Sequence, residues 1–155
     1  MRLTERMHFV PVLESEDLNS AVTGDSINMK NYHHIVYILM FNSDLAGDAV
    51  LTIKSGATDA AETTAETFSY RVSGADFGAT GADILSAELT SSSLTLTEAS
   101  YEDRVLVCEL DADAITVDQP YLTLALSNAA SAGSVTCVAL LEPRYASKVF
   151  ATAIG

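Results

Sequence analysis

Short apolar segments with a period of two, separated by turn-forming residues, recur along this chain of 155 residues. In an extended strand successive side chains point to opposite faces, so this period is typical of β-strands. The pattern predicts strands at residues 35–41, 49–54, 67–72, 93–97, 104–110, 121–126 and 134–141, and a weaker one at 21–28. Short strands at such intervals indicate an all-β, antiparallel β-sandwich, with a jelly roll among its forms and a closed barrel as the alternative.

The strongest segment, HHIVYILMF at residues 33–41, is continuous rather than alternating. A continuous apolar run is typical of a strand that is buried on both faces. We therefore expect Ile38 to lie in the core, where an Ile38→Asp substitution would bury an unpaired charge and unfold the domain. Helical signals are weak, because residues 57–66 and 76–86 favour loops and residues 112–115 allow a single helical turn.

The length corresponds to one domain, residues 1–155. The longest apolar run, residues 35–41, is far shorter than the roughly 20 residues of a membrane-spanning helix. The N-terminus lacks the apolar core of a secretory leader, so we expect the chain to remain in the cytoplasm where it is made. Cys108 and Cys137 lie in apolar strand segments, which predicts buried thiols; a disulfide would require neighbouring strands.

Charge is strongly unbalanced, with 21 acidic and 8 basic residues and a net charge of −13. General binding to nucleic acid or to an anionic membrane surface is therefore excluded. Residues 7–142 hold 20 of the acidic and 4 of the basic residues, which leaves a net charge of −16 between slightly basic ends. The hydrophobic fraction of 48% excludes a disordered chain.

Residues of catalytic or metal sites are scarce. His33 and His34 are adjacent in a predicted strand, so their side chains point to opposite faces and cannot readily bind one metal ion together. No nucleophile-elbow or phosphate-binding motif occurs. Acidic residues in predicted loops match no calcium-binding motif, and we expect them to be solvated: Asp44, Asp48, Asp59, Glu62, Asp76 and Asp83. We predict no enzyme activity, catalytic residue, metal or cofactor, and a sandwich-type hydrolase is the weakest alternative.

The two terminal segments, residues 1–13 and 143–155, combine basic and apolar residues. They either pack as edge strands on their own sandwich or form extended arms that dock on a partner, for example by adding to a sheet edge. The candidate interface residues are Arg2, Arg6, Phe9, Val10, Pro11, Pro143, Arg144, Tyr145, Lys148 and Phe150. Among these, Arg144 is the best candidate for a charged contact with a carboxylate.

The sequence motifs RMHFVPV at residues 6–12 and L-x-x-P-R-Y-A at residues 140–146 resemble the ends of a family of small head proteins of tailed bacteriophages. The resemblance implies a capsid decoration (cement) protein: a β-sandwich subunit without catalytic residues, often a homotrimer, on the outside of an assembled shell. It implies the major capsid protein and further copies of the chain as partners, and the virion surface as the location.

A carbohydrate-binding or host-adhesion module is the alternative from another functional class. The decoration hypothesis places binding in the terminal segments, whereas an adhesion module would bind through loops such as residues 55–66 or 74–86. Removing residues 143–155 and measuring capsid binding is the experiment that the sequence suggests to separate the two.

Overall fold

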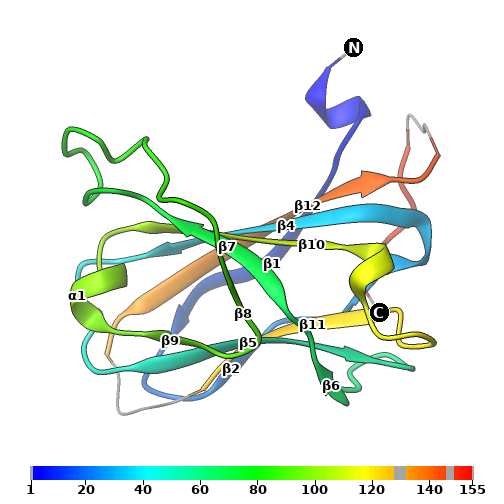
Figure 1. Ribbon diagram of the computed structural model, residues 1–155, viewed down its shortest axis with the longest axis horizontal. Coiled ribbons are helices and arrows are strands. Elements are labelled where there is room, and N and C mark those ends of the chain that lie inside the picture. The colour runs from blue at the N-terminus through cyan, green and yellow to red at the C-terminus, as the bar shows by residue number, and fades with distance from the viewer. Residues whose placement is uncertain (1, 128–131, 146–148, 155) are drawn as a thin grey trace.

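The computed structural model describes residues 2–127, 132–145 and 149–154, which form two antiparallel sheets packed face to face (Figure 1). Sheet A contains, in spatial order, β1 (His8–Asp17), β12 (Ser134–Pro143), β4 (Tyr32–Phe41), β10 (Val105–Asp111), β7 (Phe68–Val72) and β8 (Leu89–Ser91). Sheet B contains β2 (Val22–Thr23), β11 (Tyr121–Leu126), β5 (Ala49–Gly56) and β6 (Thr64–Ala65), with β3 (Ile27–Asn28) on β11 and β9 (Leu94–Leu96) on β5. The predicted all-β sandwich is confirmed.

Helical structure is limited to single turns: η1 (Leu3–Glu5), η2 (Met29–Asn31), α1 (Glu98–Tyr101) and η3 (Ala112–Ala114). The turn η3 agrees with the prediction for residues 112–115. The turn α1 was not predicted, because four residues are too few to show a helical period. Among the described residues, no helix has the length and apolar character needed to cross a membrane.

The predicted strand at residues 21–28 consists of two short strands, β2 and β3, that both pair with β11. Residues 24–26 separate them and face only two residues of β11, Thr123 and Leu124. Such an extra residue interrupts strand pairing, as in a β-bulge. The strands β6 and β8 were not predicted, since two or three residues carry no detectable period.

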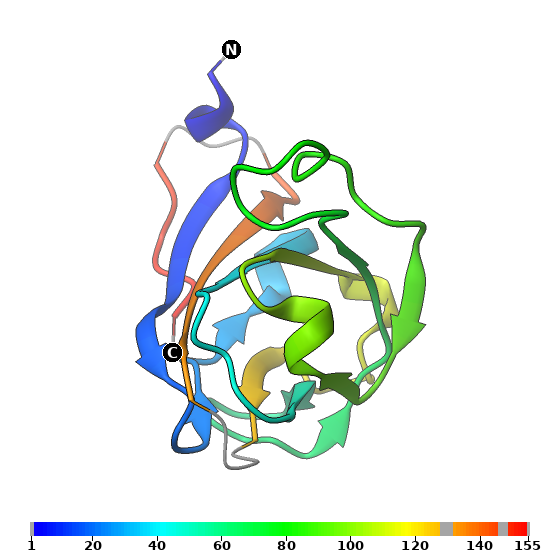
Figure 2. The same cartoon turned by 90° about the vertical axis from the view of Figure 1, so that its left-hand side faces the viewer.

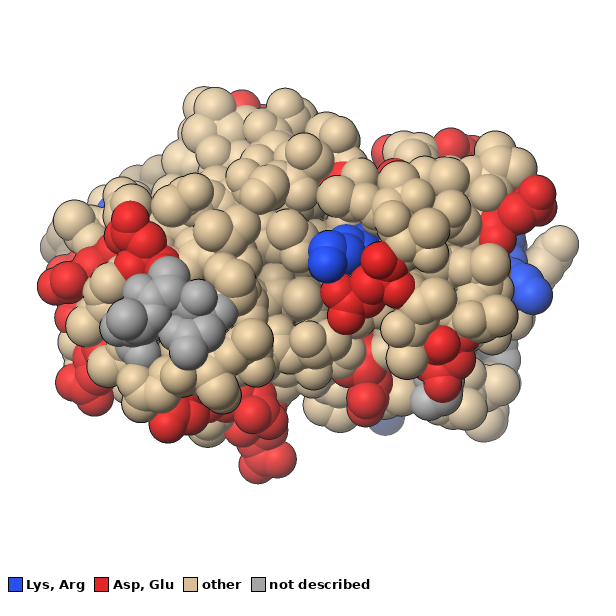
Figure 3. Space-filling view, turned by 90° about the horizontal axis from the view of Figure 1, so that it is seen from below, with Lys and Arg blue, Asp and Glu red and all other residues tan. Residues whose placement is uncertain are grey.

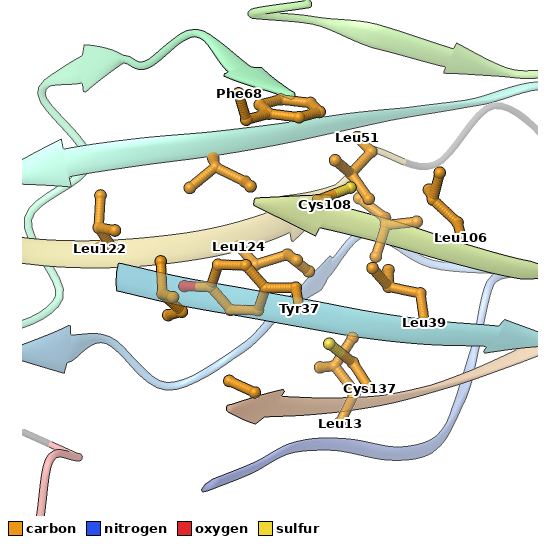
Figure 4. Close-up of a cluster of buried hydrophobic side chains, with 14 of the residues drawn as sticks. Leu13, Tyr37, Leu39, Leu51, Phe68, Leu106, Cys108, Leu122, Leu124 and Cys137 are labelled. Carbon is orange, nitrogen blue, oxygen red and sulfur yellow. The ribbon is translucent and has the colours of Figure 1, made fainter. Parts of the chain in front are cut away.

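The core lies between the central strand of sheet A and the two longest strands of sheet B. On β4, Ile35, Tyr37, Leu39 and Phe41 alternate inward and are fully buried. Leu51, Leu122 and Leu124 of sheet B lie in the same cluster (Figure 4), which also includes Ile53. Figure 2 shows the strands of the two sheets arranged around the interior of the sandwich. Each such side chain contributes about 1.5–3 kcal/mol to folding by leaving water.

The expected burial of β4 on both faces was wrong. Val36 and Ile38 point away from sheet B and are only partly buried, and Met40 on the same face is 40% exposed. Ile38 is therefore not a core residue, and the unfolding expected from Ile38→Asp has no basis in the packing. The continuous apolar sequence arises because both faces of β4 are apolar, although only one of them is covered.

Both cysteines are buried and free, as predicted from their apolar surroundings. β10 and β12 pair with opposite edges of β4, where Tyr37 lies opposite Cys108 on one side and opposite Ala139 on the other. Two interstrand spacings of about 4.8 Å separate β10 from β12, which is too far for a disulfide. Burial raises the pKa of both thiols, that of Cys137 to about 12.

The N-terminal segment forms part of its own sandwich from His8 onward, which is one of the two alternatives for the ends. β1 pairs antiparallel with β12 and places Val10 and Leu13 in the core. Val10, a candidate interface residue in the sequence, is only 2% exposed and is instead a core residue. It is inward-facing because it follows the exposed Phe9 in a strand whose side chains alternate.

The C-terminal segment also returns to the sandwich within the described residues. The carbonyl of Ala153 accepts a 2.8 Å hydrogen bond from the Asn28 N–H, and Ile154 forms a bridge with Ile27. Ala153 is buried. In Figure 2 this tail, drawn in red, runs beside β1 in blue. The candidate interface residue Lys148 lies outside the described residues.

Candidate interaction surfaces

The outward face of sheet A carries a continuous patch of apolar side chains, which we call the outer apolar face. Its members are Phe9, Pro11, Val36, Ile38, Met40, Val105, Val107, Val138 and Leu140. The strand register aligns them in rows across four strands: Ile38 of β4 lies between Val138 of β12 and Val107 of β10. In the next row, Val36 lies beside Leu140, which lies beside Phe9. All nine are exposed or only partly buried.

Charged side chains border the outer apolar face at the end where β4 begins. His34 contacts two carboxylates of β10: its Nδ1 lies 2.8 Å from Asp111 Oδ1 and its Nε2 lies 3.1 Å from Glu109 Oε2. Glu142 of β12 is opposite His34 on the other side. Burial lowers the pKa of His34, but the hydrogen bonds and charges of the two β10 carboxylates outweigh it and raise the pKa overall. These contacts give His34 a structural role at the entry to β4.

A second charged pair borders the same face on β7. Arg71, opposite Val107 in the register, lies 3.1 Å from Glu88 and donates to the Ser86 carbonyl at 3.1 Å. The centre of the outer apolar face contains no charged side chain. An apolar centre with a charged margin is the usual composition of a protein-binding surface.

The N-terminal candidate residues fall into two groups. Phe9, which is 42% exposed, and the exposed Pro11 belong to the outer apolar face. Arg2 and Arg6 flank η1, which projects from the sandwich in Figure 1, and both side chains are exposed. The structure therefore brings part of the predicted N-terminal site onto a surface that the sequence did not identify.

Most of the C-terminal candidates surround a second feature, a cavity of about 230 Å³. Pro143, Tyr145 and Phe150 line it together with Tyr32. The ring of Phe150 stacks on His8, and the His8 Nδ1 lies 2.6 Å from the Tyr32 hydroxyl. The two ends of the chain thus meet at one place, although Tyr145 itself is 78% exposed.

Arg144 is partly an internal residue. Its Nε donates to the Tyr32 carbonyl at 3.0 Å, and its backbone N–H donates to the Asn31 carbonyl at 2.8 Å. These bonds fasten the end of β12 to the start of β4. Arg144 and Lys30 also line a larger cavity of about 490 Å³.

Sequence reasoning missed Val36, Ile38, Met40, Val107, Val138 and Leu140 as surface residues. The signal was present in the strands at 35–41 and 134–141, whose outward positions are apolar where a solvent-facing strand would alternate with polar residues. The cation Lys30 was also missed, because only the fold places it near Arg144.

The loops considered for an adhesion module differ from one another. Within residues 74–86, Phe77 is 42% and Ile84 is 65% exposed, and Asp76 pairs with Arg104 at 3.2 Å. In the other loop, Glu62 pairs with Lys54 at 3.0 Å.

Figure 3, on the side of sheet B, shows acidic side chains dispersed over the surface. Among the described residues, no group of three or more His, Cys, Asp or Glu side chains is arranged to hold a metal ion.

No protein-family model and no curated protein sequence matches the chain. Among solved structures, the SPBc2 prophage-derived protein YomS has a similar fold: the TM-score is 0.51 and the identity 11%, over 87% of this chain and 91% of that one. The coat protein of Tobacco streak virus superposes with a TM-score of 0.33 and 6% identity, over 98% of this chain and 95% of that one. The first similarity is one of fold, and the second is too low to support an argument.

Proposed function

We propose that this protein is a structural virion component, a capsid decoration (cement) protein that binds the outside of a tailed-phage head and bridges its capsomers. Its partners are the major capsid protein and further copies of the chain in a homotrimer. It acts by binding alone, without catalysis, metal or cofactor. The observation that carries the proposal is the outer apolar face.

The outer apolar face joins nine apolar residues on one side of a sheet, and contiguous apolar patches on a protein surface can mark binding sites. As one face of a β-sheet, it suits a protein shell better than it suits a small ligand, which needs a concave site. The exposed Phe9 at its edge is a suitable anchor, because buried aromatic side chains dominate interface energies. We therefore assign the outer apolar face to contact with the shell.

The net charge of −13 favours the outer over the inner surface of a head, since packaged DNA would repel an acidic body. The similarity to a prophage-derived protein supports only the fold that the proposal assumes. The assignment to a phage head is based on the two terminal sequence motifs, RMHFVPV at residues 6–12 and the motif at residues 140–146.

In this proposal, binding of the protein stabilises the assembled shell by mass action. A subunit that binds only the assembled shell stabilises it in proportion to the logarithm of its concentration over the dissociation constant. In a homotrimer three copies of the outer apolar face act together, so that modest single contacts become a strong attachment.

The test is co-sedimentation of the protein with DNA-filled heads of the phage that encodes it. Hundreds of copies per head are expected, whereas only about a dozen would contradict decoration, because a vertex component has few sites. Ile38→Asp, in the middle of the outer apolar face, should abolish binding. The matched control is Val50→Asp, a partly buried β-branched residue of β5 in sheet B, which should bind normally.

Deletion of residues 143–155 is a poor test, because it removes the buried Ala153 and the Arg144 contacts that hold β12 to β4. The adhesion alternative has its own outcome. If Ile38→Asp decorates heads like the wild type and Ile84→Asp prevents attachment to host-cell polysaccharide, the loop at 74–86 is the binding site.

A further inference from the structure

A cavity lies at one end of the sandwich, and none of its lining residues belongs to the outer apolar face. It has a volume of about 490 Å³, within the usual range for ligand sites. Its apolar lining includes the buried Met29 and Ile115, and Val117 beside them is 82% exposed. Most of its lining residues belong to residues 112–120, the segment that connects β10 to β11 and is drawn in yellow at the right of Figure 1.

The wall between β10 and β11 is held by a buried carboxylate. Glu66, 6% exposed, accepts a 2.9 Å hydrogen bond from the Thr116 N–H and a further one from the Ser55 hydroxyl. The same hydroxyl contacts the Gln119 side chain at 2.8 Å. These bonds tie the connecting segment to sheet B, so the cavity is formed before any ligand arrives.

Arg144 presents an oriented guanidinium to this cavity. Its Nε is occupied by the Tyr32 carbonyl, which fixes the plane of the group. Its Nη2 lies 3.7 Å from Asp113 Oδ1, and the Asp113 side chain is 92% exposed. A distant, solvated partner of this kind is easily displaced, and an arginine fork can then bind an incoming carboxylate through two parallel hydrogen bonds.

Lys30 supplies a second cation on the same cavity, and its ammonium makes no ion pair with any residue that the structure describes. In contrast, Lys54, Arg71 and Arg104 each have a carboxylate within 3.0–3.2 Å. The cavity also contains Asp113 and Asp118, so two acids balance the two bases. The two acids repel a phosphate dianion more strongly than a single carboxylate, so a carboxylate fits this lining better than a phosphate.

We propose that this cavity binds an acidic peptide segment of a partner protein. The carboxylate of an Asp or Glu side chain lies between Arg144 and Lys30, and a neighbouring apolar side chain packs on Met29 and Ile115. The inference goes beyond the proposed head binding and does not depend on it, because the cavity can be tested with a free peptide.

The experiment uses the full-length, ¹⁵N-labelled protein and two peptides, acetyl-Leu-Glu-amide and the uncharged acetyl-Leu-Gln-amide. The acidic peptide should give saturable shifts of the backbone amides of Thr116, Val117 and Gln119, and the Gln peptide should bind at least about fivefold more weakly. Added salt should weaken the acidic peptide only.

Lys30→Gln should weaken the acidic peptide by about three- to tenfold without affecting the fold, because the Lys30 side chain is exposed. The matched control is Lys54→Gln, which removes a cation that Glu62 already neutralises and should change nothing. Equal binding of the two peptides, no shifts at these three amides, or unchanged affinity in Lys30→Gln would each overturn the inference. Head binding by the wild type would remain unaffected by any of these results.

Discussion

The imidazole of His8 stacks on the phenyl ring of Phe150, with ring centroids 5.1 Å apart and ring planes inclined by 11°. This contact joins the first strand to the C-terminal tail. The tail continues to Ala153, whose carbonyl accepts the Asn28 N–H. The N-terminal and C-terminal segments of the chain are therefore in contact with each other.

Removing the Phe150 ring should detach the tail without unfolding the sandwich. In Phe150→Ala, we expect the Asn28 amide to exchange its hydrogen at least about tenfold faster, because the bond to Ala153 is no longer held in place. The amide of Leu39 should be unchanged. Tyr145→Ala, which removes a 78% exposed ring, is the control. Equal exchange rates at Asn28 in wild type and Phe150→Ala would show that the tail is held by other contacts.

Acidification should break the hydrogen bond between His8 and Tyr32 and thereby loosen the attachment of the C-terminal tail. Burial lowers the pKa of His8 below its ordinary value of 6.5, so the neutral ring accepts the Tyr32 hydroxyl at neutral pH. The stabilisation is complete above pH 6.5 and is lost as the pH falls through the lowered pKa, where a proton occupies Nδ1. The protection of the Asn28 amide, which is its intrinsic exchange rate divided by its observed rate at the same pH, should therefore fall in that range. A His8→Asn variant, which cannot titrate there, should not show this fall in protection.

His34 should give the opposite pH dependence. Its pKa is raised by Asp111 and Glu109, so its stabilisation is complete below pH 6.5 and is lost as the pH rises through the raised pKa. The loss of unfolding free energy in His34→Gln should therefore be larger near about pH 5.5, where the carboxylates are still ionised, than near about pH 8.5. Urea titrations at the two pH values measure this loss of unfolding free energy, and a Gln substitution of the exposed His33 is the control. An equal loss at both pH values in His34→Gln would contradict the assigned ion pairs.

Two neighbours on β4 should respond differently to truncation. Leu39 is fully buried, so Leu39→Ala should lower the free energy of unfolding by about 2–5 kcal/mol. Ile38 is on the outer apolar face, and Ile38→Ala should cost about 1 kcal/mol or less in the isolated protein. Denaturant titration of the two variants measures the two losses of unfolding free energy. Comparable losses would mean that the outward face of sheet A is covered in solution, as by a second copy.

The same two residues show how far the sequence predicts this fold. The strand itself is predictable, because the apolar run at 35–41 has flanking turn signals. The exposure of the outward face of this strand is not predictable from the sequence. An outward apolar residue such as Ile38 gives the same sequence pattern whether the chain itself or a partner covers it. The cavity was unpredictable for another reason: Lys30 and Arg144 are far apart in the chain, and only the pairing of β12 with β4 brings them together.

The buried hydroxyl of Tyr37 is a source of instability that one substitution can remove. Tyr37 is fully buried, and its hydroxyl has no hydrogen-bond partner among the described residues. Burial raises the pKa of this phenol well above 10.0, so the group stays neutral and unpaired in the apolar cluster of Figure 4. An unpaired buried hydroxyl costs about 1–3 kcal/mol, and Tyr37→Phe should therefore raise the free energy of unfolding by about 1 kcal/mol.

The matched control for Tyr37→Phe is Tyr32→Phe, which removes the hydroxyl that bonds to His8. It should lower the free energy of unfolding by about 0.5–1.5 kcal/mol, because that hydroxyl has a partner. Urea titrations of both variants at pH 7 provide the comparison. A loss of stability in Tyr37→Phe would indicate that an ordered water satisfies the Tyr37 hydroxyl, since deleting the group would then break a hydrogen bond.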